Sequence, residues 1–141
     1  CYPEIHPQAE DAHHDIRYFV EKAQLGASSA ITQYFYNADA YFRFVDDVNK
    51  LGLHIPIIPG IMPISNYSQL KRFSQMCGAE IPRWMAQRML SYGDDVESIR
   101  EFAADCVADL CRKLLAGGAH ELHFYTLNIA NPTTSVLSRL A

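Results

Sequence analysis

The sequence predicts an α/β fold with parallel strands, because two kinds of apolar pattern alternate along the chain. Segments whose apolar residues recur at steps of three and four alternate with short runs of β-branched and aromatic residues. Such alternation is typical of parallel strands joined by helical crossovers. The chain has 141 residues, whereas a closed (β/α)₈ barrel needs about 250. The pattern alone therefore leaves two alternatives, a small doubly wound domain and part of a barrel.

The first half of the chain contains two predicted helices and two predicted strands. They are expected in the order helix 7–25, strand 30–36, helix 37–52 and strand 54–58. Apolar residues between Ala9 and Ala23 give the first helix one apolar face. The segment Ala30–Tyr36 is short and rich in β-branched and aromatic residues, as expected of a buried strand. Asn37 or Asp39 can cap the second helix.

The second half contains four predicted helices and one predicted strand. They are expected in the order helix 66–77, short helix from 82, long helix 94–116, strand 121–127 and short helix from 132. Ser65-Asn66 can cap the first of these helices, and Pro82 suits the first turn of the second. Asp94 and Glu97 resemble a capping box at the start of the long helix. Pro132 is expected to begin the last helix.

Composition favours a soluble, reduced, cytoplasmic protein. Apolar residues make up 49% of the chain and charged residues 20%, and the net charge is −4, which argues against binding to nucleic acid or an anionic membrane. No apolar run approaches the roughly 20 residues that span a bilayer. The four cysteines form no C-x-x-C pair. The start, Cys1–Glu4, has neither the basic flank nor the apolar stretch of a signal peptide. It also lacks an initiator Met, so Cys1 is interpreted as a cut point inside a longer chain, with processing as the alternative.

Ligands of parallel α/β proteins bind at the carboxyl ends of the strands, and this rule selects four segments. They are 33–37, 59–66 and 125–128, and also 2–7 if a strand precedes Cys1. Their uncharged hydrogen-bonding groups, aromatic rings and prolines suit a flat ligand better than a metal or a polyphosphate. His120 and His123 enter a predicted strand, where a step of three residues points to opposite faces. No metal site is therefore expected.

Several residues in these segments allow both a structural and a functional interpretation. Gln33 is an amide within an apolar strand, so it either bonds to barrel neighbours or contacts a ligand. Phe73 has the spacing of a core residue, but it could stack on a ligand if its helix leans over the site. Asp15 and Lys22 share one helix face, which is either solvated or binds a polar cofactor tail. His6, between two prolines, suits either a loop contact or a hydrogen bond to a ligand.

At the same segments the sequence resembles methylenetetrahydrofolate reductase. The matching stretches are Tyr2–Ala9, Ala30–Phe35, Ile58–Ile61 and Leu122–Asn128. The last is highly specific to the family, and order and spacing match over essentially the whole chain. The resemblance implies a (β/α)₈ TIM barrel that holds FAD, with residues 1–141 as the C-terminal half of that single domain, roughly strands 6–8 with their helices. It also implies that NAD(P)H reduces the flavin, which then reduces 5,10-methylenetetrahydrofolate to 5-methyltetrahydrofolate.

The resemblance also assigns roles to individual residues. The family's flavin contacts fall on Tyr2, His6, Ala9, Asp15, Tyr18 and Lys22. Gln33 matches a glutamine that meets nicotinamide and folate, Gln69 matches a folate contact, and Phe73 matches the aromatic that stacks on the substrate. Two positions depart from the family. Tyr18 replaces a smaller polar or imidazole side chain, and Ile129 replaces an arginine that helps to hold the folate.

The proton donor that the chemistry needs has no counterpart in these residues. The resemblance places the catalytic glutamate, and an aspartate near the flavin, in the first half of the barrel. We therefore expect the chain to supply binding and orientation, to pair with the N-terminal half, and to be inactive alone. Two alternatives remain at this stage, a flavin-binding module without catalysis and a half-barrel that associates with a second copy of itself. A homo-oligomer is compatible with each of these.

Overall fold

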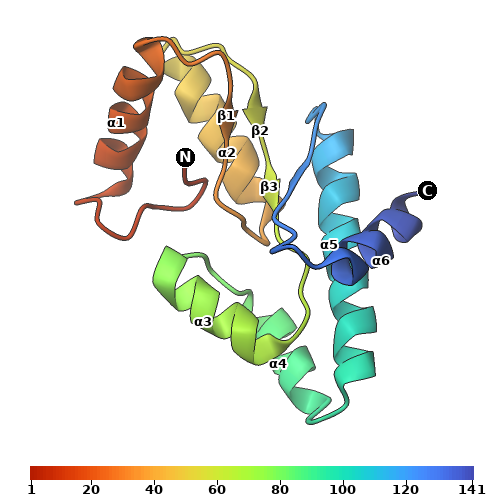
Figure 1. Ribbon diagram of the computed structural model, residues 1–141. Coiled ribbons are helices and arrows are strands. Elements are labelled where there is room, and N and C mark those ends of the chain that lie inside the picture. The colour runs from red at the N-terminus through yellow and green to blue at the C-terminus, as the bar shows by residue number, and fades with distance from the viewer.

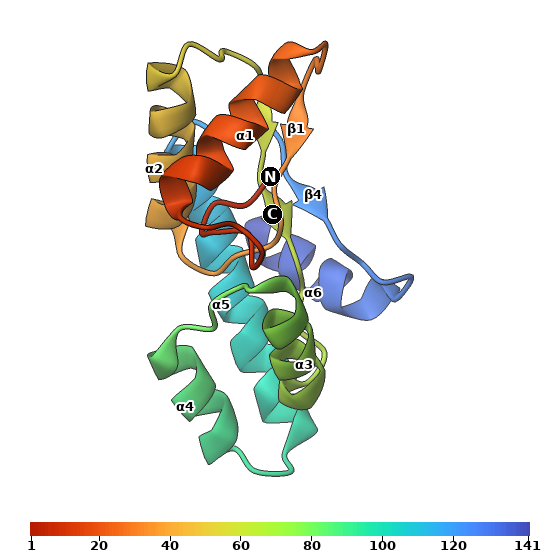
Figure 2. The ribbon, with the colours of Figure 1, turned by 90° about the vertical axis from the view of Figure 1, so that its left-hand side faces the viewer.

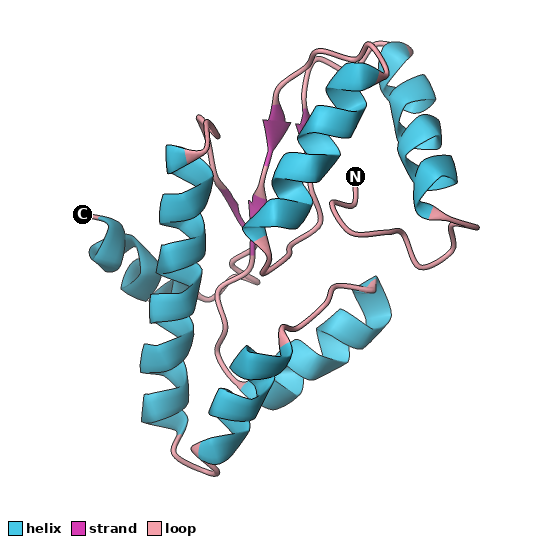
Figure 3. Ribbon diagram, turned by 180° about the vertical axis from the view of Figure 1, so that it is seen from behind, coloured by secondary structure: helices cyan, strands magenta, loops and turns pink.

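The computed structural model describes all 141 residues and shows helices arranged along a short row of parallel strands (Figure 1). The elements are α1 (Ala12–Gln24), β1 (Ala30–Ile31), α2 (Ala38–Lys50), β2 (Ile57–Ile58), β3 (Gly60–Ile61), α3 (Tyr67–Cys77), α4 (Arg83–Ser91), α5 (Val96–Ala116), β4 (His123–Phe124) and α6 (Ala130–Leu140). The predicted alternation of helices and strands is confirmed. Figure 3 shows how small the strand content is beside the helices and loops.

The strands pair in parallel, as the alternation predicts. Ala30 of β1 lies opposite Ile57 of β2, and Gly60 of β3 lies opposite His123 of β4. Cys1 extends the row at the other edge. Its amino nitrogen donates to the carbonyl of Ile31 at 3.2 Å, and its own carbonyl accepts from the Gln33 N–H at 2.7 Å. This is the hydrogen-bond pattern of two parallel neighbours, so four chain segments lie side by side.

The paired segments are shorter than predicted. The sequence predicts strands over 30–36, 54–58 and 121–127, but regular pairing covers two residues in each strand. Pro56 and Pro59 have no N–H to donate; Pro56 precedes β2, and Pro59 separates β2 from β3. Phe35 and Tyr36 continue from β1 as an irregular segment, and their side chains are buried in the core.

Two of the predicted caps are confirmed, and three helix starts differ. The side chains of Asn37 and Asn66 cap α2 and α3. The first helix begins at Ala12 rather than at Pro7, because Asp11 accepts from the His14 N–H at 2.7 Å and ends the preceding loop.

The other two corrections concern the long helix and the last helix. Asp95, not Asp94, caps α5, and its carboxylate accepts from the Ser98 N–H at 3.1 Å. The last helix begins at Ala130, two residues before Pro132. Proline is tolerated there because the first-turn N–H groups of a helix have no partner within it.

One hydrophobic core of 28 buried residues joins the helices to the strands. Phe35, Val48 and Leu114 have no exposed surface, and they come from the β1–α2 segment, α2 and α5. Figure 2 shows α2 and α5 on one side of the strand row. Ile31 of β1 is nevertheless 41% exposed. Even the longest helix, α5, is too polar to cross a membrane, and no other helix combines the required length and apolarity.

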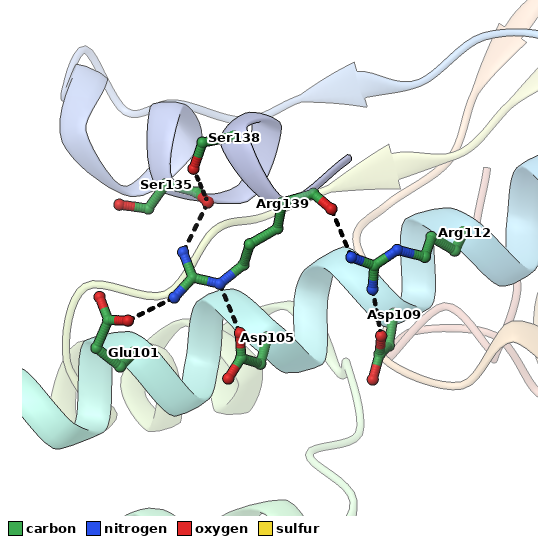
Figure 4. A network of polar contacts seen from close by, with 7 residues as sticks. All are labelled: Glu101, Asp105, Asp109, Arg112, Ser135, Ser138 and Arg139. Atoms are coloured by element: carbon green, nitrogen blue, oxygen red, sulfur yellow. Dashed lines mark hydrogen bonds and ion pairs between the residues drawn. The ribbon is translucent and has the colours of Figure 1, made fainter. Parts of the chain in front are cut away.

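Arg139 fixes the last helix to α5 (Figure 4). Its guanidinium binds Glu101 at 2.6 Å and also Asp105, and both carboxylates belong to α5. From the α5 side, Arg112 donates to the backbone carbonyl of Arg139. These contacts, together with the buried Val136, hold α6 and the loop that precedes it against the rest of the fold.

Candidate functional site

The carboxyl ends of β1, β3 and β4 lie next to one another. The Tyr125 N–H donates to the carbonyl of Ile61 at 2.8 Å, which continues the β3–β4 pairing. The Tyr125 hydroxyl donates to the carbonyl of Thr32, also at 2.8 Å, so one side chain spans from β4 to the end of β1. The segments that the strand-end rule selects are therefore brought together.

Gly60 makes this crossing possible. A Cβ atom at this position would lie 2.2 Å from the carbonyl oxygen of Thr32 and 2.6 Å from the Tyr125 ring. The Gly60 N–H also donates to Thr32 Oγ1 at 2.9 Å, which satisfies the one fully buried threonine of the core. Only glycine leaves room for the aromatic ring above the middle strand at this point.

Gln33 follows Thr32 and is half-buried. Its side-chain Oε1 accepts from the Tyr34 N–H at 3.0 Å, which orients the amide. The two N–H donors of the amide then remain for other partners. The neighbouring Tyr34 hydroxyl hydrogen-bonds to Ser74 of α3 at 3.1 Å, so the end of β1 is attached to α3 as well.

Gln69 and Phe73 line a narrow slot between the loop before α3 and the loop before α6. Tyr125 and Leu127 form its opposite wall, and Ile129 lies at its rim among the lining residues. Phe73 is half-buried, and the Arg72 guanidinium lies 5.5 Å from the centre of its ring. The slot is narrow, with a volume of only about 10 Å³, and seven of its 14 lining residues are hydrophobic.

The structure places two of the three predicted substrate residues in the same slot. Gln69 and Phe73 share the slot, whereas Gln33 is not among its lining residues. Gln33 is connected to it through Thr32 and Tyr125, because Tyr125 both lines the slot and binds the Thr32 carbonyl.

The predicted flavin contacts occupy the N-terminal segment and α1. Tyr2 and His6 pack edge to face, with ring centres 4.5 Å apart. The His6 N–H donates to the Asp15 carboxylate at 2.8 Å, which joins the segment to α1. The Gln8 N–H donates to His6 Nδ1 at 3.1 Å, so a neutral His6 ring has its proton on Nε2. Ala9 closes the turn by donating to the His6 carbonyl at 2.9 Å.

The remaining two predicted flavin contacts are exposed on α1. Tyr18 is 61% exposed, and Lys22 lies one turn further along the helix. Asp15, Tyr18 and Lys22 share one helix face because they are three and four residues apart. Tyr2 and Asp15 also line an open cavity of about 520 Å³ beside α2. The carboxylate, phenol and ammonium groups on this face provide hydrogen bonds and one positive charge for a polar cofactor.

No metal cluster is found at the strand ends, and the two cysteines of α5 carry no activated thiol. No group of three or more His, Cys, Asp or Glu residues is placed to hold one metal ion. The His123 ring instead packs against Tyr125, with centres 4.9 Å apart. Burial raises the pKa of the Cys106 and Cys111 thiols to about 11, so both are protonated at neutral pH.

Sequence reasoning selected the segments but missed the contact that holds them together. The hydrogen bond from Tyr125 to Thr32 joins residues 93 positions apart, and no local pattern indicates it. The close sequence pair Pro59-Gly60 was selected as a strand end, yet only the structure shows why the glycine is required. Arg100 and Thr133, which line the slot or the cavity beside it, were also not selected.

Comparisons with known proteins agree on one family. The sequence model of the family described as "Methylenetetrahydrofolate reductase" matches residues 1–141. A "5,10-methylenetetrahydrofolate reductase" of Buchnera aphidicola (subsp. Schizaphis graminum) is 42% identical over 96% of this chain and 47% of its own length. The protein of the same description from Escherichia coli K12 is 39% identical over 99% of this chain and 47% of its own length. The chain thus spans about half the length of these curated relatives.

A solved structure supports the fold. It is described as an uncharacterized protein from Clostridium thermocellum that binds two copies of 5-methyl-5,6,7,8-tetrahydrofolic acid. Its superposition has a TM-score of 0.61 and covers 98% of this chain and 50% of that protein, at 18% sequence identity. The arrangement of helices and parallel strands described above therefore recurs as half of a larger structure.

Proposed function

Because the chain belongs to the methylenetetrahydrofolate reductase family, we propose that it is the C-terminal half of the barrel of a cytoplasmic, flavin-dependent reductase. The proposed reaction is the reduction of 5,10-methylenetetrahydrofolate to 5-methyltetrahydrofolate, with FAD as cofactor and NAD(P)H as the source of electrons. The activity belongs to the longer protein, and this half contributes binding and orientation.

The observation that supports this function most directly is the slot at the strand ends. It brings together two aromatic side chains, Phe73 and Tyr125, and two amides, Gln69 and Asn66. A pterin ring is flat and has hydrogen-bonding edges, and a nicotinamide ring is flat with one amide. Such rings match a site that offers a stacking face and a few polar groups. Gln33, whose amide N–H groups remain free to donate, is proposed to bind the carbonyl oxygen of either ligand.

The residues of the N-terminal segment and α1 are chemically suited to hold FAD. Lys22 can pair with a phosphate, Asp15 and Tyr18 can accept or donate hydrogen bonds to hydroxyl groups, and His6 offers its Nε2–H. Bound FAD would supply the hydride transfer, which no side chain of this half can perform. Tyr2 and His6, packed edge to face, would form one wall for the flavin.

The N-terminal half of the same protein is the proposed partner. β4 pairs only with β3, which leaves its other edge unpaired, and Ile31 is 41% exposed on the strand row. Closing the row into a barrel with further strands would pair this edge and cover the exposed apolar surface. That half is also proposed to contain the acid that protonates the folate. Association of two copies of this half is the alternative way to cover the same surface.

The test is the activity of the full-length protein that contains this chain. Purified protein is expected to show a flavin absorption spectrum that NADH or NADPH bleaches and 5,10-methylenetetrahydrofolate restores. Gln33→Ala and Phe73→Ala are expected to slow the reoxidation of the flavin by the folate and to have a smaller effect on flavin binding. Absence of folate-dependent flavin reoxidation would contradict the proposal. Sedimentation of residues 1–141 expressed alone, with or without the N-terminal half, separates self-association from pairing of the two halves.

A further inference from the structure

Two adjoining depressions lie at the ends of β3 and β4, and Arg100 is the only charged residue that lines either. The first is the slot of Gln69 and Phe73, whose walls contain no charged side chain. The second is a cavity of about 280 Å³ between the loop before α3, α5 and the start of α6. Gln69 and Ile129 line both depressions, so a ligand that contacts these residues can extend into the cavity.

The positive charge of Arg100 is not neutralised by a neighbour. Arg100 lies on α5 and is exposed, and the four ion pairs of the chain involve Lys50, Arg112 and Arg139 instead. Glu101 and Asp105, which are close to Arg100 in sequence, bind Arg139 (Figure 4). The contact that docks α6 therefore occupies the two carboxylates and leaves Arg100 available to an anion.

Further polar groups in the two depressions also suggest a ligand. The hydroxyl of Thr133, in the wall of the slot, is the only buried side-chain oxygen or nitrogen in the chain that has no hydrogen-bond partner. Buried polar groups are normally paired, so this hydroxyl suggests a polar atom supplied by a bound molecule. Asn66 and Asn131 add amide donors around the cavity of Arg100, and Ser135, whose hydroxyl donates to Asn131 Oδ1, adds an acceptor.

We propose that Arg100 binds the carboxylates of the glutamate tail of the folate. This inference rests on the proposed function. The family resemblance places a positive side chain at the position of Ile129, and we infer that Arg100 of α5 supplies that charge instead. An isoleucine side chain cannot pair with a carboxylate, whereas a guanidinium can bind one through two parallel hydrogen bonds. The pterin and aminobenzoyl rings would lie against the residues of the slot, which is too narrow in this half alone to enclose them, and the tail would occupy the adjoining cavity.

The experiment compares ligands with and without the tail on the full-length, FAD-loaded protein. The probes are 5-methyltetrahydrofolate with one glutamate, the same compound with three glutamates, and tail-free 5-methyltetrahydropteroate. Dissociation constants are measured for wild type, Arg100→Ala, Arg100→Lys and the control Arg88→Ala. Arg88 is a matched control because it lies on α4, above the ring of Tyr92 at 5.0 Å, and lines neither depression.

Arg100→Ala is expected to weaken binding of both glutamylated ligands about tenfold and to leave the tail-free ligand unchanged. Arg100→Lys should recover part of the loss, and Arg88→Ala should match wild type. In turnover, Arg100→Ala should raise the KM for the folate and leave kcat and flavin reduction by NAD(P)H unchanged. Equal affinity of wild type and Arg100→Ala for the glutamylated ligands, or an equal loss for the tail-free ligand, would overturn the inference. A wild type that binds none of the three probes would overturn the proposed function itself.

Discussion

The slot at the ends of β3 and β4 and the N-terminal segment 1–11 belong to one proposed site, but different forces hold them. Around the slot, the contacts are neutral: Tyr125 donates to the Thr32 carbonyl, and Tyr34 bonds to Ser74. The N-terminal segment depends on two carboxylates that accept from backbone N–H groups. Asp15 of α1 binds the N–H of His6, and Glu4 of the segment binds the N–H of Glu80.

This difference predicts different sensitivities for the two regions. Contacts between neutral buried groups do not titrate near neutral pH, so the slot should keep its geometry over a wide pH range. Contacts to carboxylates depend on ionisation and on solvent exposure, and surface ion contacts are individually weak. The slot is therefore formed within this half of the barrel, whereas the proposed flavin contacts depend more on conditions and on the missing half.

The largest expected effect is that of Gly60→Ala in the full-length protein. The added Cβ would lie 2.2 Å from the Thr32 carbonyl oxygen, a backbone atom that cannot rotate away. We expect the free energy of unfolding to fall by about 3 kcal/mol, since overpacking of this kind moves backbone as well as side chains. Urea denaturation followed by circular dichroism measures the loss.

Gly26→Ala is the control for this substitution. A Cβ at Gly26 meets nothing within 4 Å, and only its φ of 131° is unfavourable for alanine. Its expected cost is about 1 kcal/mol. If the two variants lose the same free energy of unfolding, the close approach of Tyr125 is not the reason that position 60 requires a glycine.

The next effect is that of Tyr125→Phe, which keeps the ring and removes the bond to Thr32. Loss of one partly buried hydrogen bond is expected to cost about 1–2 kcal/mol of unfolding free energy. Because Thr32 precedes Gln33, which is proposed to bind both ligands, flavin reduction by NAD(P)H and folate-dependent reoxidation of the flavin should both slow. Tyr92→Phe is the matched control, since the Tyr92 ring is half-buried and its hydroxyl forms no hydrogen bond within the chain. Equal kinetics of the two variants would contradict a positioning role for Tyr125.

In the N-terminal segment, Asp15→Ala is expected to have a smaller effect on the free energy of unfolding. The substitution removes the acceptor of the His6 N–H, at a cost of about 1 kcal/mol for a partly exposed contact. The flavin content per protein should fall more clearly than the melting temperature. Glu10→Ala removes an exposed carboxylate that forms no ion pair and serves as the control. If Asp15→Ala keeps its full flavin content, Asp15 does not belong to the proposed cofactor site.

The sequence could predict the features that local chemistry determines. Asn37 and Asn66 were selected as caps because an asparagine before an apolar helix is a short-range signal. The choice between neighbouring carboxylates was wrong at α5, where Asp94 and Asp95 both fit the sequence pattern. Strand lengths were overestimated because the apolar run after Ile31 continues into the core without strand pairing.

The site was predictable in its segments and not in its internal contacts. The strand-end rule and the resemblance selected Gln33, Gln69 and Phe73, and the structure places two of them in one slot. The rule carries no information about pairs that are distant in the chain, such as Tyr125 and Thr32. Family likeness was equally silent about Arg100, because it concerns a position where this chain does not follow the family.

The smallest expected effect is the pH dependence that Glu4 confers on the N-terminal segment. Burial raises the pKa of Glu4 above its ordinary 4.5, and the charge of Glu80 adds to the rise, while the hydrogen bond from the Glu80 N–H opposes it. A carboxyl group whose pKa is higher in the folded state binds protons more tightly there. Its contribution to stability is therefore present at low pH and is lost as the pH rises from about 4.5 through the raised pKa.

Glu4→Gln isolates this contribution, because the amide oxygen can still accept from the Glu80 N–H but does not ionise. The variant should equal wild type at pH 4 and become slightly more stable than wild type toward pH 7, as followed by melting temperature. Glu10→Gln, at an exposed position of the same segment, should show no such divergence. If the melting temperatures of Glu4→Gln and wild type differ by the same amount at every pH, ionisation of Glu4 does not influence how the segment is held. The contrast with the neutral slot would then depend on Asp15 alone.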